Sequence, residues 1–168
     1  GTVASGIASS KLTGALPAIS GASLTGFTDA QMPTGSVLQV VQATTSTKTS
    51  TTSTSFSDTG LTAAITPSSS SNKILVIISA SCYQAGATAI LRLLRGNTYK
   101  DFGYPAGYNG LEMLNYVPIT YLDSPSTTSA TTYKMQHKRT HGSGSFHSNF
   151  GDSGGTMPSY ITLMEIAG

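Results

Sequence analysis

KILVIISASCYQAGATAILRLLR, residues Lys73 to Arg95, holds two apolar runs separated by a short polar segment that contains Gly86. This pattern predicts a β-hairpin made of two apolar strands. Successive side chains of a strand point to opposite sides, so every second residue of a run shares a face. The residues predicted on one face of each strand are Ile74, Val76, Ile78, Ala80 and Cys82, followed by Ala89, Leu91 and Leu93.

The opposite face of the same stretch is also apolar, because it carries Leu75 and Ile77 in the first run and Ile90 and Leu94 in the second. A half-exposed antiparallel strand is apolar on one face only, so we expect this stretch to be covered on both sides. On one side the stretch is expected to pack against the core of its own domain. Since the chain has few other apolar runs, we interpret the contact on the second side as one with another subunit.

The composition of the whole chain favours one β-rich domain with a short appendage. Its 168 residues are 38% apolar, enough for a core, and only 10% charged, against about a quarter in an average soluble domain. Serine and threonine take the place of the missing charges. Such a surface is typical of extracellular fibres and β-rich adhesins.

The same composition narrows the expected partners. A net charge of +2 is too small to predict nucleic-acid binding, which needs a concentrated basic face. No apolar stretch approaches the roughly 20 residues that span a bilayer, so membrane insertion is not expected. Cys82 is the only cysteine, which excludes an intrachain disulfide. The chain begins at Gly1 without a methionine, which suggests a fragment of a longer protein.

Residues 1–33 differ from the rest by their small side chains and by a repeat, because Leu12-Thr13-Gly14 recurs as Leu24-Thr25-Gly26. One such segment cannot bury its own apolar residues, but three copies wound around a shared axis can. We therefore predict a fibre stalk that trimerises; the alternative is a flexible Gly/Ser linker. The predicted contacts between the three stalk segments are Ile7, Leu12, Leu16, Ile19, Leu24 and Phe27.

Residues 34–168 contain about eight short apolar or alternating segments and no helical period. The clearest alternation runs from Thr131 to Arg139, with Tyr133, Met135 and His137 predicted to face inward. The Ser/Thr tract of residues 44–55 fits a solvated edge strand or hairpin as well as disorder. We interpret 97–115 as the longest irregular segment. The predicted fold is all-β, an antiparallel β-sandwich of the jelly-roll type that forms a tip domain after the stalk.

The catalytic motifs in the chain are incomplete. Residues 151–155, GDSGG, match the stretch around the nucleophile of chymotrypsin-like proteases, but His137, His141 and His147 all lie just before the motif instead of well upstream. Gly, Asp and Ser are also the residues that turns between strands favour, so the motif is equally consistent with a turn. The histidine spacing does not predict a metal site on a strand, and the seven acids form no obvious pair for sugar hydrolysis. We expect no enzyme, no metal and no cofactor.

The aromatic loop within 97–115 is the best candidate for binding. Tyrosine and asparagine on loops offer stacking faces and hydrogen bonds to sugars or protein surfaces. The alternative is that Phe102 and Tyr104 fill the core or a subunit interface. The predicted receptor-binding residues are Phe102, Tyr104, Tyr108 and Asn109.

Several stretches together resemble the distal parts of the tail fibres of tailed bacteriophages. They are LTGALPAISGASLTG (12–26), GSVLQVVQ (35–42), TGLTAAITPSSSSNKILV (59–76), YLDSPSTTSATTYKMQ (121–136) and ITLMEIAG (161–168). The resemblance implies a homotrimer in the virion tail, outside the cell, that joins the remainder of the tail and adheres to a glycan or outer-membrane protein of the bacterial host. A structural collar or capsid-decoration protein and a polysaccharide depolymerase are the alternatives.

Overall fold

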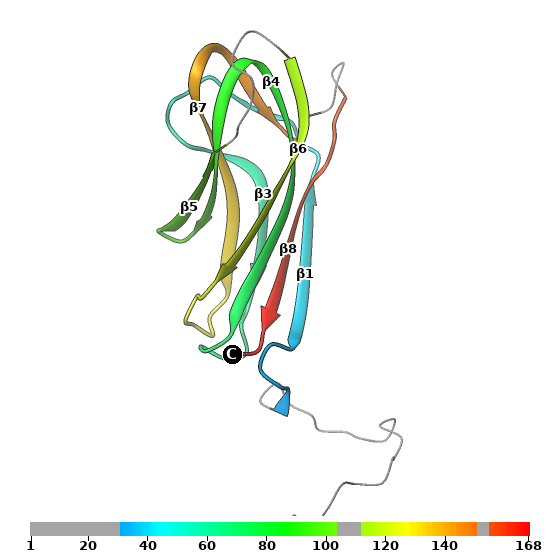
Figure 1. Ribbon diagram of the computed structural model, residues 1–168, viewed down its shortest axis with the longest axis vertical. Helices are drawn as coiled ribbons and strands as arrows, with labels where there is room; N and C mark the ends of the chain where they lie inside the picture. Colours follow the sequence, from blue (N-terminus) through cyan, green and yellow to red (C-terminus); the bar gives the residue numbers. More distant parts are fainter. Residues whose placement is uncertain (1–30, 104–111, 151–154) are drawn as a thin grey trace, which may run out of the picture.

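The computed structural model describes residues 31–103, 112–150 and 155–168, and all regular elements in these ranges are antiparallel strands (Figure 1). This confirms the all-β prediction. The strands are β1 (Val37–Thr45), β2 (Thr49–Thr51), β3 (Ser57–Ile65), β4 (Lys73–Arg95), β5 (Thr98–Gly103), β6 (Glu112–Asp123), β7 (Thr131–Ser148) and β8 (Ser159–Ile166). Short β2 pairs with β7, so part of the Ser/Thr tract forms a strand, as one of the two interpretations expected.

The predicted hairpin within Lys73–Arg95 is wrong, because β4 is one strand of 23 residues. Its first half pairs with β6 and β8, and its second half pairs with β5 and β7. Gly86 does not form a turn; it has a positive φ of 70° and lies where the register between β4 and β7 shifts. A bulge of this kind adds one residue and bends the strand without ending it.

The true hairpin of this region lies further along the chain, between β4 and β5. Gly96, with a φ of 54°, and Asn97 form its turn, and Arg95 then pairs with Thr98. Residues 98–103 therefore belong to a strand, which corrects the expectation of an irregular segment from 97 to 115. Tyr99 and Phe102 have the high strand propensity that explains the pairing.

The eight strands belong to one sheet that curls into a half-barrel with two arms. The β8 arm consists of β1, β8, residues 73–81 of β4, and β6; the β7 arm consists of β3, β5, residues 89–95 of β4, and residues 131–138 of β7. In Figure 1, β4 and β7 both arch over at the top and connect the arms. We call this the arched end; it comprises residues 82–88 and 139–148.

The core lies between the two arms and receives every second side chain from both. On β4 the buried apolar residues are even-numbered up to Cys82 and odd-numbered from Ala87, so the bulge at Gly86 keeps the same face inward. Two polar residues of the other face near the arched end, Ser81 and Thr88, are buried as well. The faces predicted for the two apolar runs are thus confirmed. The principal core residues are Leu61, Ile65, Ile74, Val76, Ile78, Leu91, Leu93, Tyr133, Met135, Ile161 and Leu163.

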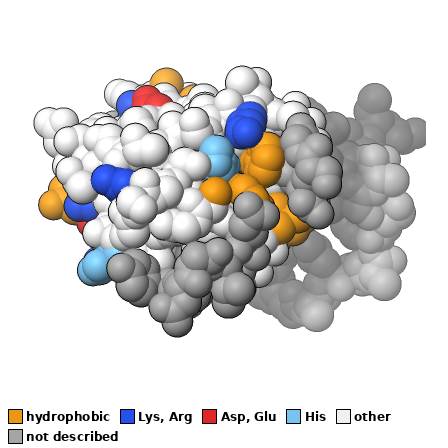
Figure 2. Space-filling view, turned by 90° about the horizontal axis from the view of Figure 1, so that it is seen from above, with side chains coloured by type: hydrophobic (Ala, Val, Ile, Leu, Met, Phe, Trp, Pro, Cys, Tyr) orange, Lys and Arg blue, Asp and Glu red, His pale blue; other side chains and the backbone are white. Residues whose placement is uncertain are grey.

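Two glycines of β7 let the chain pass close to β4 at the arched end. A Cβ atom on Gly144 would overlap the carbonyl oxygen of Ala85, and one on Gly142 would overlap that of Gly86. Gly142 also has a φ of 85°, which other residues rarely adopt. Seen from this end, the surface shows few charged side chains among many uncharged atoms (Figure 2).

The predicted stalk contacts Ile7, Leu12, Leu16, Ile19, Leu24 and Phe27 all lie outside the described residues. Within the described ranges the structure holds no helix long and apolar enough to cross a bilayer.

Candidate ligand-binding site

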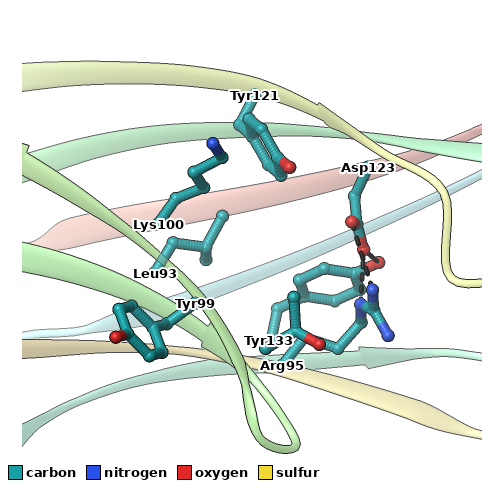
Figure 3. A pocket seen from close by; sticks show the side chains of 8 residues that line it. Leu93, Arg95, Tyr99, Lys100, Tyr121, Asp123 and Tyr133 are labelled. Carbon is teal, nitrogen blue, oxygen red and sulfur yellow. Dashed lines mark hydrogen bonds and ion pairs between the residues drawn. The ribbon is translucent and has the colours of Figure 1, made fainter.

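A pair of adjoining hollows lies where β5 meets the ends of β4, β6 and β7. The smaller one, which has room for about one water molecule, is lined by Leu93, Arg95, Thr98, Tyr99, Lys100, Tyr121, Asp123 and Tyr133 (Figure 3). The larger one has a volume of about 370 Å³ and is lined by Arg95, Gly96, Asn97, Thr98, Ala130, Thr131 and Thr132. Arg95 and Thr98 line both, so we call the combined feature the Arg95 site.

The floor of the Arg95 site is a hydrogen-bonded ion pair. The carboxylate of Asp123 accepts hydrogen bonds from Nε of Arg95 at 2.5 Å and from the hydroxyl of Tyr133 at 2.7 Å. Burial, followed by the hydrogen bond to Asp123, raises the pKa of Tyr133 far above its ordinary value. The hydrogen bond to Asp123 likewise raises the pKa of Arg95. Tyr133 therefore stays protonated and Arg95 stays charged, and their hydrogen bonds to Asp123 connect side chains of three strands.

The rim of the site offers one cation and two aromatic rings. The ammonium group of Lys100 lies 5.9 Å from the ring centroid of Tyr121, and in Figure 3 the Lys100 side chain extends toward Tyr121. Lys100 is exposed and forms none of the ion pairs found among the described residues. Tyr99 is 53% exposed and stacks on the guanidinium of Arg92 at 3.7 Å.

Hydroxyl and amide groups line the larger hollow beside this rim. Asn97 and Thr98 come from the turn and start of β5, and Thr131 and Thr132 come from the start of β7. Its volume falls in the range of small-ligand sites, which is about 300 to 1,000 Å³. A polar ligand with one apolar face fits these groups, because they combine hydrogen-bonding atoms with aromatic rings.

The structure places only one of the predicted receptor-binding residues, because Tyr104, Tyr108 and Asn109 lie outside the described ranges. Phe102 is half-buried, pairs with Leu91 and packs against the core, as the alternative interpretation expected. The sequence analysis missed Arg95, Lys100, Tyr121 and Asp123 as site residues. They come from three different strands, and no local pattern signals that they meet.

Of the residues that the sequence offered for catalysis, His137 and Cys82 are buried in the core, and Ser153 lies outside the described residues. Ser153 of the GDSGG motif is not among the described residues. His137 is buried, and its Nδ1 lies 2.9 Å from the hydroxyl of Ser148, which is also buried. Burial, followed by the charge of His147, lowers the pKa of His137 to about 4. Burial raises the pKa of Cys82 to about 12, far from that of a reactive thiol.

Four carboxylates whose side chains the structure describes are bound to cations or to hydrogen-bond donors. Asp58 pairs with Lys134, Asp101 with Arg92 and Asp123 with Arg95, while Glu165 accepts several hydrogen bonds. Hydrogen bonds from their partners hold the pKa of Asp58 and of Asp101 below the ordinary value. A general acid for sugar hydrolysis needs a raised pKa instead.

No group of three or more His, Cys, Asp or Glu side chains within the described ranges is placed to hold a metal ion. The comparison with known proteins adds no assignment, because no family model and no curated protein matches this chain.

Proposed function

We propose that this chain is the receptor-binding tip of a tail fibre of a tailed bacteriophage, and that it adheres to the bacterial surface without catalysis. In this proposal a trimeric stalk of residues 1–33 carries a sandwich-like head of residues 34–168. The observation that carries the binding role is the Arg95 site, a preformed polar hollow with an exposed lysine and tyrosine rings on its rim. The resemblance of the sequence to fibre ends supports the location in the virion tail.

The chemistry of the Arg95 site favours a glycan that carries a carboxylate, such as a uronic acid unit of a surface polysaccharide. Lys100 supplies an accessible cation for the carboxylate. The tyrosine rings offer flat surfaces for the apolar face of the sugar, and Asn97 and Thr131 offer hydrogen bonds. Three such sites on one trimer would bind a repetitive surface far more tightly than one site alone.

Glycan binding by the full chain tests this proposal, with Lys100→Ala as the variant and Lys73→Ala as the matched control. Both lysines are exposed, and Lys73 lies on the other arm at the start of β4. An array of neutral and acidic glycans should retain the protein on acidic ones. Lys100→Ala should weaken that binding by about tenfold or more, the usual effect of removing a charged hydrogen-bond partner.

The control should bind like the unaltered protein. Equal binding by Lys100→Ala and Lys73→Ala would remove the Arg95 site from the proposal, and retention on neutral glycans alone would remove the acidic ligand.

A structural collar or capsid-decoration protein is the second candidate, favoured by the uncharged outer surface of the β8 arm that is analysed below. Binding of labelled protein to intact host cells separates an adhesin from such a structural part. A depolymerase is supported least, given the lowered pKa values of Asp58 and Asp101. Release of reducing ends from host polysaccharide would identify it.

A further inference from the structure

The outer faces of the two arms differ sharply in charge. On the β7 arm, outward positions carry Asp58, Arg92, Asp101, Lys134 and Lys138, several of which form ion pairs or stack on aromatic rings. On the β8 arm, Lys73 at the start of β4 is the one charged side chain found at an outward position among the side chains that the structure describes. The described outward positions between Lys73 and the arched end hold no charged residue. The two faces belong to one sheet, so the difference does not follow from the fold.

The uncharged face is also apolar. Six of the large hydrophobic side chains that remain 37% to 55% exposed lie on it: Val40, Ile77, Leu114, Tyr116, Leu122 and Tyr160. The register brings two of them, Val40 and Leu122, into one continuous apolar row across the arm, because Val40 pairs with Met164, Met164 with Leu75, and Leu75 with Leu122. Contiguous exposed apolar surface of this kind marks an interaction site.

The size of this face is adequate for a stable contact. Four strands about 4.8 Å apart and about nine residues long at 3.4 Å each give a face of roughly 600 Å². Two such faces bury roughly 1,200 Å² in total, which lies above the ~1,000 Å² expected of a specific interface.

We propose that the outer face of the β8 arm packs against a second copy of this chain. An uncharged face of hydroxyl and apolar side chains is complementary to itself, because no like charges meet across the contact. A partner with a charged surface would find no counter-charge there.

This inference goes beyond the proposed homotrimer, because two copies of one face that pack against each other are related by a twofold axis, and this contact is separate from the threefold stalk. It assigns the contact in the head to a particular face, in addition to the stalk. The Arg95 site shares β6 with this face, but Tyr121 and Asp123 alternate with Thr120 and Leu122 and therefore lie on the other side of the sheet. Glycan binding and self-association are separate measurements, and either can fail without the other.

Sedimentation velocity of the full chain over a range of concentrations tests the proposal with two variants that carry the same change. Thr120→Lys places a charge on the uncharged face, opposite Ile77. Thr132→Lys places the same charge on the outer face of the β7 arm, opposite Ala64. Both threonines are exposed strand residues, so neither variant removes core packing. Circular dichroism melting confirms that both fold.

The unaltered chain and Thr132→Lys should sediment as the same oligomer. Thr120→Lys should raise the dissociation constant by at least about tenfold, since lysines from adjacent copies repel within a dry contact. Leu122→Thr, which removes apolar contact without adding charge, should shift the equilibrium in the same direction. A monomeric unaltered chain would overturn the proposal, and so would equal association of Thr120→Lys and Thr132→Lys.

Discussion

Glu165 shows how single residues tie the β8 arm together. Its buried carboxylate accepts hydrogen bonds from the backbone and hydroxyl of Ser68, the amide of Asn72 and the amide of Gln39, at 2.5 to 2.8 Å. Burial by itself would raise the pKa of Glu165, but the hydrogen bonds outweigh it and hold the pKa below its ordinary value. The carboxylate therefore stays charged and fixes the turn before β4 against β8 and β1.

His137 gives a prediction about acid stability. Its pKa is lowered by burial to about 4 from 6.5, so the folded state keeps the ring neutral while the unfolded chain takes up a proton. The free energy of unfolding should therefore decrease as the pH falls from 6.5 towards 4, by roughly 3 kcal/mol in total. Urea denaturation at several pH values measures this slope.

His137→Gln is the variant for this measurement, because an amide can still hydrogen-bond to Ser148 but does not titrate. It should lose most of the slope between pH 6.5 and 4. A residual slope is expected from His147, whose pKa is also lowered by burial. A variant that keeps the full slope would assign the acid sensitivity to another group.

At the scale of elements, the two long strands β4 and β7 determine the shape, because β4 runs through both arms and β7 pairs with it through the arched end. They bend together at the arched end, where Gly86 of β4 faces Gly142 and Gly144 of β7. A polar segment with a glycine has the composition of a turn as well as of a bulge. Which of the two forms depends on the partner strand, and β7 pairs with β4 on both sides of Gly86. The sequence pattern of Lys73–Arg95 does not contain this information, so it predicted a hairpin that does not form.

Gly144→Ala should destabilise the fold, because the added methyl group would overlap the backbone of Ala85. Overpacking against a backbone atom costs about 2 to 3 kcal/mol. Gly103→Ala on β5 is the control, since nothing lies within 4 Å of a Cβ atom built there. Thermal melting should show a much lower midpoint for Gly144→Ala only. Equal midpoints would mean that the arched end adjusts freely.

At the scale of the whole molecule, the half-barrel separates three surfaces. The charged face of the β7 arm meets solvent, the uncharged face of the β8 arm is the proposed contact between copies, and the Arg95 site opens where β5 approaches the ends of β6 and β7. The expectation that the apolar stretch is covered on both sides is met on one side by the single chain and stays a prediction for the other side. Its core face is buried in the single chain, and Ile77 on the reverse remains 38% exposed.

The predicted stalk gives a test of its own, with Leu16→Asp as the variant and Ser10→Asp as the control. Both residues lie in residues 1–33, but only Leu16 is among the predicted contacts. If three copies bury the leucines, Leu16→Asp should weaken association by about tenfold or more, because a carboxylate would enter an apolar contact. A flexible linker would leave both variants unchanged in sedimentation.

The sequence by itself determined the all-β class, the strand over residues 131–139, and the inward face of each apolar run. These properties are local, since alternation with a period of two depends only on neighbouring residues. The connection between the runs, the curling of the sheet and the meeting of Arg95, Lys100, Tyr121 and Asp123 were decided by the tertiary structure alone. They depend on pairing between strands far apart in the chain, and neither periodicity nor composition records which strands pair.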